Sequence, residues 1–265
     1  MDDQTTRGER FRALHEGEPF VIPNPWDAGS ARVLEGLGFA ALATTSSAFA
    51  FTLGRSDGQV SLDELAAHVA ALATATGLPI SVDLENGFGA APEAAATAIR
   101  RAAEAGAVGG SIEDWDRDGG LYERGHAVER VAVAAEAARA LGFPFTLTAR
   151  AENHIRGNPD IEDTIARLQA YAAAGADVLY APGLRSADEI RAVCAAVSRP
   201  VNVLALGPLS FGEIAGAGAQ RVSVGGSLAW AGVTAFAAAA EAIRDRGDFS
   251  GLGSGRETAR LLAGG

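Results

Sequence analysis

Residues 77–89 read Gly-Leu-Pro-Ile-Ser-Val-Asp-Leu-Glu-Asn-Gly-Phe-Gly. Gly77 follows an alanine-rich helical pattern, and a glycine at that place supplies the left-handed cap that ends a helix. The apolar run after it predicts a buried strand over residues 79–85. The strand ends in two carboxylates, Asp83 and Glu85, which share a face because side chains alternate along a strand. This stretch therefore predicts one unit of helix, short turn, strand and acidic strand end.

The same pattern recurs along the chain. The predicted strands are Phe20–Trp26, Ala40–Thr45, Pro79–Glu85, Val108–Asp114, Phe145–Glu152, Asp177–Pro182, Pro200–Ala205 and Arg221–Gly225. Between and after them the helical patterns cover Ala28–Leu37, Leu62–Thr76, Pro92–Ala105, Ala127–Leu141, Ile161–Ala174, Ala187–Val197, Phe211–Ala217 and Leu228–Arg246. The segments that follow the strands at Phe51–Ser61 and Trp115–Gly125 are long, rich in glycine and charged, as in the catalytic loops of an α/β barrel.

Eight such units without a change of composition predict one α/β domain over residues 1–250, a closed (β/α)8 TIM-type barrel. A doubly wound open sheet is the alternative, and it is disfavoured because no Gly-x-Gly-x-x-Gly turn follows the first strand. Residues 251–265 are expected to form a linker and a short C-terminal helix, Glu257–Ala263. That helix could pack on a neighbouring subunit.

Composition excludes several classes of protein. The 265 residues are 48% hydrophobic and 21% charged, which is enough to form a full core and argues against disorder. A formal charge of −11 disfavours binding to nucleic acid or to an anionic membrane. The single Cys194 excludes a disulfide framework, and no secretory signal is visible at the start, so we expect a cytoplasmic protein. The uncharged segment Val222–Ala240 contains glycines that favour a strand, a turn and a helix over a membrane span.

Charged side chains cluster at the predicted carboxyl ends of three strands. These are Asp83 and Glu85, then Glu113, then Arg150 and Glu152. Carboxylates that converge on a barrel mouth repel one another unless a cation lies among them, and oxygen ligands without His or Cys favour Mg²⁺ or Mn²⁺. The alternative is that these are solvated loop acids.

Two further features fit an anionic substrate. The guanidinium of Arg150 suits a substrate carboxylate, although it could instead form a salt bridge with Glu152 or Glu113. The run Thr44-Thr45-Ser46-Ser47 offers hydroxyl and backbone N–H donors for a small anion, but such a run is ordinarily only a turn.

Several motifs together resemble the isocitrate lyase/phosphoenolpyruvate mutase superfamily. They are Asn24-Pro25-Trp26-Asp27, Thr45-Ser46-Ser47, Leu53-Gly54-Arg55-Ser56-Asp57-Gly58, Asp83-Leu84-Glu85-Asn86-Gly87-Phe88-Gly89, Ile112-Glu113-Asp114 and Ala149-Arg150. The resemblance implies a barrel whose last helix is exchanged with a partner in a homodimer or homotetramer. It also implies a Mg²⁺ ion, with Mn²⁺ as an alternative, held largely through water by Asp83, Glu85 and Glu113.

The resemblance further implies the roles of the other site residues. Asp57 lies on a mobile loop and, with Arg150 and His126, is expected to be catalytic. The expected substrate-binding residues are Trp26, Thr45, Ser46, Ser47, Asp83, Arg150 and Asn202.

The loop after Glu113 departs from the lyase pattern. Isocitrate and methylisocitrate lyases carry Lys-Arg-Cys-Gly-His there, whereas residues 115–126 contain no cysteine. Cys194 lies in a predicted helix and cannot replace it. His126, Tyr122, Arg124 and His154 are the candidate proton donors or acceptors, each of which could instead be an ordinary surface residue.

The sequence therefore predicts a Mg²⁺-dependent lyase. We expect it to break a C–C bond in a small 2-hydroxy or 2-oxo dicarboxylate, of the oxaloacetate or substituted-malate type, through a pyruvate-like enolate. One alternative is C–P chemistry, as in a phosphonopyruvate hydrolase or a phosphoenolpyruvate mutase. The other is an inactive barrel that serves as a binding protein.

Overall fold

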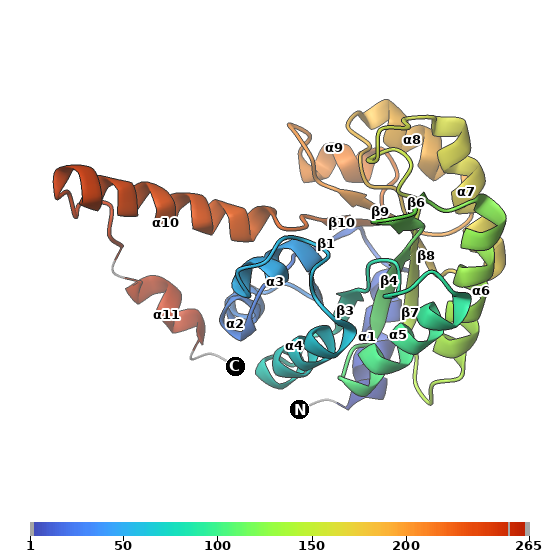
Figure 1. The fold of residues 1–265 in the computed structure, drawn as a ribbon, viewed down its shortest axis with the longest axis horizontal. Coiled ribbons are helices and arrows are strands. Elements are labelled where there is room, and N and C mark those ends of the chain that lie inside the picture. The colour runs from blue at the N-terminus through green and yellow to red at the C-terminus, as the bar shows by residue number, and fades with distance from the viewer. Residues whose placement is uncertain (1–2, 254, 263–265) are drawn as a thin grey trace.

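The computed structural model describes residues 3–253 and 255–262, and it contains a barrel of eight parallel strands (Figure 1). The strands, in their order around the sheet, are β1 (Phe20–Ile22), β10 (Arg221–Ser223), β9 (Val201–Leu204), β8 (Val178–Tyr180), β7 (Thr146–Arg150), β4 (Gly109–Glu113), β3 (Ile80–Asp83) and β2 (Leu42–Ala43). A backbone hydrogen bond of 3.1 Å from Ala43 N to Pro23 O links the two ends of this order. The predicted TIM-type barrel is confirmed, and all eight predicted strands are present but shorter.

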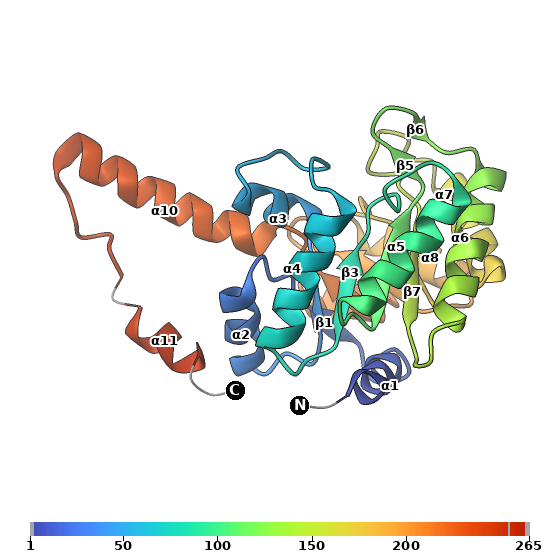
Figure 2. The same cartoon turned by 60° about the horizontal axis from the view of Figure 1, so that its bottom comes forward.

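Helices alternate with the strands and surround the barrel (Figure 2). They are α2 (Ala28–Gly36), α4 (Leu62–Ala75), α5 (Pro92–Glu104), α6 (Arg124–Arg139), α7 (Ile161–Ala174), α8 (Ala187–Ala196) and α9 (Phe211–Gly216). Several start at a capping box, in which the cap and the third helical residue bond each other's backbone; Ser61 with Glu64 in α4 is one case. Gly175 ends α7 in the left-handed conformation, φ 109°, which glycine adopts without strain. These local signals explain why the helices were predictable.

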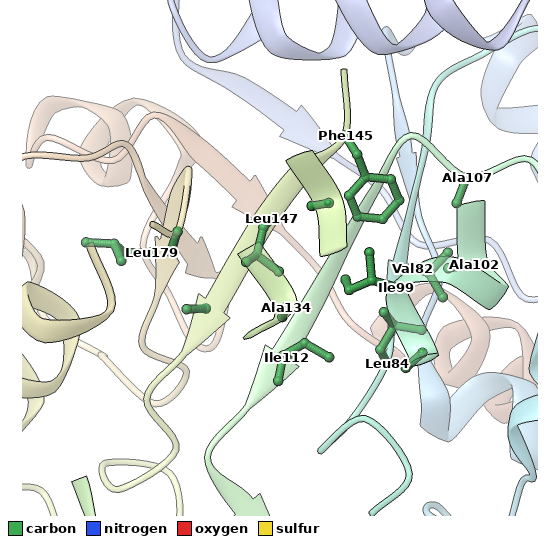
Figure 3. Packing of buried hydrophobic residues seen from close by; sticks show 14 of the residues in the cluster. Val82, Leu84, Ile99, Ala102, Ala107, Ile112, Ala134, Phe145, Leu147 and Leu179 are labelled. Atoms are coloured by element: carbon green, nitrogen blue, oxygen red, sulfur yellow. The ribbon is translucent and has the colours of Figure 1, made fainter. Parts of the chain in front are cut away.

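The core lies between the strands and the helical layer. Val82 and Leu84 of the β3 segment pack near Ile99 of α5, and Ile112 and Leu147 continue the same cluster on the neighbouring strands (Figure 3). Each of these side chains is at most 2% exposed. Buried side chains of this size stabilise the fold by roughly 1.5–3 kcal/mol each. The carboxyl ends of β3, β4 and β7 are thereby fixed relative to one another.

A helix that the sequence analysis did not predict lies at the amino-terminal end of the barrel. This is α1 (Gln4–Leu14), whose Phe11 is completely buried. Gln4 Nε2 donates to the carbonyls of Ala103 and Ala107, at 2.7 and 2.8 Å. Helix α1 comes very close to the segment before β7 at Gly8, where a Cβ atom would lie 2.3 Å from Pro144 O.

The carboxyl-terminal region extends away from the barrel. Helix α10 (Ser227–Arg246) projects as an arm, and α11 (Arg256–Leu262) returns to contact α2 (Figures 1 and 2). The predicted tail helix ended at Ala263, which lies outside the described residues. Among the helices of residues 3–253 and 255–262, none is both long enough and apolar enough to span a membrane.

Two predicted loops contain regular structure instead. Residues Ser46–Thr52 form α3, so Ser46 and Ser47 begin a helix and do not lie in an open turn. The segment after Glu113 contains a two-stranded hairpin of β5 (Trp115–Asp116) and β6 (Gly120–Leu121). Helix α6 also starts earlier than predicted, at Arg124, because Glu123 caps it through the backbone N–H groups of Gly125 and His126.

Candidate active site

Arg150 lies at the centre of the carboxylates at the carboxyl end of the barrel. Its Nη1 donates to Asp83 Oδ1 at 2.8 Å, and its Nη2 lies 3.0 Å from Glu113 Oε2 and 2.7 Å from Glu152 Oε1. The Arg150 side chain is 13% exposed, and Asp83, Glu113 and Glu152 are 16%, 8% and 1% exposed. The salt bridge that the sequence analysis gave as an alternative role for Arg150 is therefore present.

The ionisation of this cluster reflects its burial. Burial first, and then the charges of Glu152 and Asp83, raise the pKa of Glu113 well above its ordinary value, although Arg150 opposes them. Burial disfavours the charged form of Arg150, but the three surrounding carboxylates outweigh it and raise the pKa of the guanidinium. Arg150 is thus shared by three acids, and a second guanidinium, that of Arg156, lies 3.0 Å from Glu152 Oε2 and 3.8 Å from Glu113 Oε1.

Glu85 lies at the turn that follows β3. Its backbone has φ 48°, in the left-handed region, so a non-glycine residue is held here in a conformation that is uncommon for it. Burial, followed by the charges of Asp83 and Asp57, raises the pKa of Glu85 to about 7. The charges of Arg117 and Arg150 oppose this shift, and a cation beside the carboxylate would oppose it further.

A buried network behind the site fixes Glu152. Asp114 Oδ1 accepts from the backbone N–H of Glu152 at 2.7 Å. Its other oxygen accepts from Arg167 Nη1 at 3.1 Å and from the Tyr171 hydroxyl. Asp114, Arg167 and Tyr171 are at most 6% exposed. These residues do not reach the cavity, and their role is to hold the carboxyl ends of β4 and β7 in position.

Two adjoining cavities open at this end of the barrel. The first has a volume of about 710 Å³ and is lined by Ser46, Asp57, Glu85, Glu113 and Arg150, among others. The second, of about 310 Å³, extends into the barrel and is lined by Thr45, Ser47, Asp83, Arg150 and Asn202, among others. Arg150 and Asp57 line both. Most of the expected site residues are therefore brought to one place.

The hydroxyl residues after β2 support Asp83. Thr44 Oγ1 accepts from Asp83 N at 2.9 Å, and the backbone N–H of Ser46 points to Asp83 Oδ2 at 3.4 Å. Because Ser46 and Ser47 begin α3, their N–H groups have no partner within the helix. The N–H group of Ser47 is suited to a small anion, whereas that of Ser46 already points to Asp83.

Trp26 and His126 do not line either cavity. Trp26 lies at the start of α2, where its backbone N–H bonds Ser30 Oγ at 3.0 Å. His126 is in the first turn of α6, with Nε2 2.9 Å from Ala90 O. Neither residue lines a cavity that Arg150 lines, so neither enters the function proposed below.

The other candidate proton donors are similarly engaged. Tyr122 bonds Asp116 Oδ2 at 3.0 Å, and His154 lies 3.8 Å from Glu189. Cys194 is in α8, as predicted, and burial raises the pKa of its thiol to about 11.

Three residues at the cavities were missed by the sequence analysis. Arg117, at the tip of the β5–β6 hairpin, contacts the backbone oxygen of Asp57. Arg156 lies over the Trp115 ring at 4.7 Å and bonds Glu152 Oε2 at 3.0 Å, and Tyr180 lies under Arg150 at 5.1 Å. Of these three residues, only Tyr180 had a signal in the sequence, namely its position at the end of a predicted strand. The two arginines belong to loops whose shape the local sequence does not determine.

The donor set suits a hard divalent cation held partly through water. Within residues 3–253 and 255–262, no three His, Cys, Asp or Glu side chains lie close enough together to ligate an ion directly. However, Asp83, Glu85 and Glu113 supply only oxygen donors, and a cation beside Glu85 would stabilise the charged form that burial disfavours there. These three carboxylates therefore fit a hard divalent cation such as Mg²⁺.

A parallel eight-stranded barrel with acids and an arginine at the carboxyl ends of its strands has the architecture of a (β/α)8-barrel enzyme. Residues 11–244 match the phosphoenolpyruvate phosphomutase family, and the chain belongs to it. The resemblance to the isocitrate lyase/phosphoenolpyruvate mutase superfamily is thus confirmed, as is the expectation of an enzyme of that superfamily.

Individual relatives cover most of the chain. It is 31% identical over 246 residues to an oxaloacetate decarboxylase of Bradyrhizobium diazoefficiens, a match that spans 91% of this chain and 83% of the relative. A crystal structure from Burkholderia cenocepacia J2315 has 54% sequence identity and a TM-score of 0.95 over 98% of this chain and 96% of that one. The structure of oxaloacetate acetylhydrolase in complex with its product oxalate has 25% identity and a TM-score of 0.87, over 99% and 96%.

Proposed function

We propose that the protein is a Mg²⁺-dependent lyase that breaks a C–C bond of a small 2-oxo or 2-hydroxy dicarboxylate, of the oxaloacetate or substituted-malate type. The observation that carries the proposal is the Arg150 cluster, a buried guanidinium among carboxylates that opens onto a cavity. The oxaloacetate decarboxylase and the oxaloacetate acetylhydrolase both act on oxaloacetate by name, which supports this substrate class.

Asp83, Glu85 and Glu113 would hold the cation, largely through water. When bound, Mg²⁺ would supply positive charge for the oxygen on which negative charge develops as the C–C bond breaks. The raised pKa values of Glu85 and Glu113 support this placement, because a cation would stabilise the charged forms that burial disfavours.

The chain's own residues bind and orient the substrate. Arg150 donates to the substrate carboxylate with N–H groups that bond Asp83 and Glu113 in this structure. The backbone N–H groups at the start of α3 bind the second oxygen of the same 2-oxo acid unit. Asn202 and Ser223, linked by a 3.0 Å hydrogen bond, line the deep side of the cavity. The scissile bond then points outward, toward Asp57.

For oxaloacetate the bond between C3 and the C4 carboxylate breaks, CO₂ leaves, and the electron pair forms the enolate of pyruvate. A proton must then return to C3. Asp57 lines both cavities on the loop before α4, and it is the residue that we assign to move protons. In a 2-hydroxy substrate the same carboxylate would accept the hydroxyl proton as the C–C bond breaks.

The test is turnover of ¹³C-labelled oxaloacetate with Mg²⁺, followed by NMR. Pyruvate with CO₂ indicates decarboxylation, whereas oxalate with acetate indicates hydrolysis. Because oxaloacetate also decarboxylates in solution, Arg150→Gln at the same protein and Mg²⁺ concentrations is the control. We expect Arg150→Gln to lower kcat/KM by roughly 10²–10³-fold, the usual effect of removing one group that stabilises an oxyanion.

The same assay is run with 2-alkylmalates as substrates. Turnover of phosphonopyruvate is followed by ³¹P NMR. Cleavage of phosphonopyruvate alone would replace the C–C proposal by C–P chemistry. No turnover of any of these substrates, by a protein that still binds oxalate with Mg²⁺, would indicate a binding protein and contradict the proposed lyase.

A further inference from the structure

A third cavity, of about 500 Å³, lies at the opposite end of the barrel from Arg150. It is bounded by the end of α1, the end of α6 and the segments that lead into β7, β8 and β9. Helix α1 covers the neighbouring part of this barrel end through Phe11 but leaves the cavity open. The cavity is therefore separate from the candidate active site.

Three guanidinium groups from different elements line this cavity. Arg12 comes from α1, Arg139 from α6 and Arg199 from the segment before β9. All three act on the carboxylate of Asp177 and oppose the increase in its pKa that burial causes. With Glu16, which also lines the cavity, there are three cations and two acids, in a chain whose net charge is −11. The cavity is locally positive on an acidic protein.

The arginines are largely free to bind another group. Arg139 Nη2 donates to Gly175 O at 3.2 Å. Within the described part of the chain, the side chains of Arg12 and Arg199 make no hydrogen bond and no close ion pair. Asp177 itself accepts from the backbone N–H of Leu147 at 2.8 Å, so part of its hydrogen-bonding capacity is already used.

One wall of the cavity is apolar. Phe143, Pro144, Phe145 and Pro200 lie beside the arginines. A simple inorganic ion would use the guanidinium groups but not this wall. An anion that also carries a compact organic part would use both, because burial of its apolar surface adds to the charge-assisted hydrogen bonds.

We propose that this cavity is a binding site for a small organic anion with at least two negative charges. Arg12 and Arg199 would bind the charged end, Arg139 would contribute from the rim, and the organic part would pack against Phe143 and Pro144. The charged end is either a phosphate ester or a polycarboxylate. This site is independent of the reaction proposed for Arg150.

The experiment is isothermal titration calorimetry at constant ionic strength with EDTA present. Three probes are used, namely phenyl phosphate, inorganic phosphate and citrate. The variant Arg12→Gln/Arg199→Gln removes two cations from the cavity. The matched control, Arg100→Gln/Arg191→Gln, removes two exposed arginines of α5 and α8. Arg150→Gln tests whether a probe binds in the active-site cavity instead.

We expect saturable binding of one organic anion per chain, by either phenyl phosphate or citrate. The double variant should weaken it at least about tenfold, since two charge-assisted hydrogen bonds to the anion are lost. The control and Arg150→Gln should change the affinity less than twofold. Tighter binding of phenyl phosphate would identify a phosphate ester, and tighter binding of citrate a polycarboxylate.

Several outcomes would overturn the proposal. These are no saturable binding of phenyl phosphate or citrate, equal loss in the control variant, or loss in Arg150→Gln with retention in the double variant. Binding of inorganic phosphate as tight as that of phenyl phosphate, with no binding of citrate, would also contradict a role for the apolar wall. If the double variant does not fold, Arg199→Ala alone, at an exposed position, is the variant to titrate.

Discussion

Glu85 is a residue whose ionisation would be coupled to the binding of a cation. Its pKa is raised to about 7 by burial and then by Asp83 and Asp57. A divalent cation binds the deprotonated carboxylate, so binding must release the proton that Glu85 holds below pH 7. We therefore expect the affinity for Mg²⁺, measured by calorimetry with oxalate present, to fall as the pH is lowered from 8 to 6, approaching tenfold per unit below 7.

Glu85→Gln provides the control for this pH dependence. The amide cannot ionise, so the variant should bind Mg²⁺ more weakly at pH 8 and should lose much of the change between pH 8 and 6. An unchanged pH dependence in Glu85→Gln would show that Glu85 is not the titrating group.

His15 is a second residue whose burial has a measurable consequence. Burial, and then the nearby charge of Arg221, lowers its pKa from 6.5 to about 3. Below pH 6.5 the unfolded chain binds a proton at His15 that the folded protein does not bind. The free energy of unfolding is therefore unaffected by this group above pH 6.5 and decreases as the pH falls from 6.5 toward 3. This group should lower the free energy of unfolding by up to about 1.4 kcal/mol per pH unit below 6.5.

Urea unfolding at pH 7, 6 and 5 measures this effect. His15→Gln should reduce the slope of the free energy of unfolding against pH by an amount that corresponds to nearly one proton. The substitution changes the absolute stability as well. His68, whose pKa burial lowers to about 4, remains in both proteins and accounts for part of the remaining slope. Identical slopes for the two proteins would contradict the assignment to His15.

The β5–β6 hairpin is an element that shapes the cavity above the acids. Its tip places Arg117 against the loop at Asp57, where Gly58 has φ 71° and any Cβ would overlap the guanidinium. Arg150 is already paired with three carboxylates, so Arg117 is the better placed cation for a second substrate carboxylate. Arg117→Gln should raise KM for oxaloacetate about tenfold or more and should affect the binding of oxalate less, because oxalate has no distal carboxylate beyond its two-carbon unit.

Arg124→Gln is the matched control for the hairpin variant, because Arg124 is an exposed arginine at the start of α6. It should leave KM within twofold of the original. Equal effects of Arg117→Gln on the dicarboxylate and on oxalate would show that Arg117 shapes the cavity without selecting the substrate.

Elements also show what the sequence could and could not predict. Several strands were predictable because an apolar run follows a helix that ends at or near a glycine, as Gly175 does before β8, and the acids followed from their places at strand ends. The cap expected at Gly77 is absent, because α4 ends at Thr76 in an extended conformation. Helix α1 was missed because its sequence is polar, and its long-range contacts, such as that of Phe11, determine its place. Arg117 and Arg156 were missed because tertiary contacts fix the loops that carry them.

At the scale of the whole molecule, the α10 arm exposes apolar side chains that a barrel alone does not cover. On α10, Trp230 is 46% exposed and Phe236 73%, and Phe249, in the segment after this helix, is 63% exposed. Large exposed apolar side chains gathered on one element are typical of protein interfaces. We therefore retain, as a proposal, that the protein is a homodimer or homotetramer in which α10 and the tail helix pack against a partner subunit.

Phe236→Glu tests this assembly, since a carboxylate buried in an apolar interface without a partner is strongly unfavourable. We expect light scattering to show a smaller species for Phe236→Glu at micromolar concentration, and a similar change when the residues after Gly251 are deleted. Phe211→Glu, which places the same charge at an exposed phenylalanine of α9, should keep the original mass. If Phe236→Glu and the deletion both keep that mass, the arm is not the interface, and the exposed face of α10 then needs another explanation.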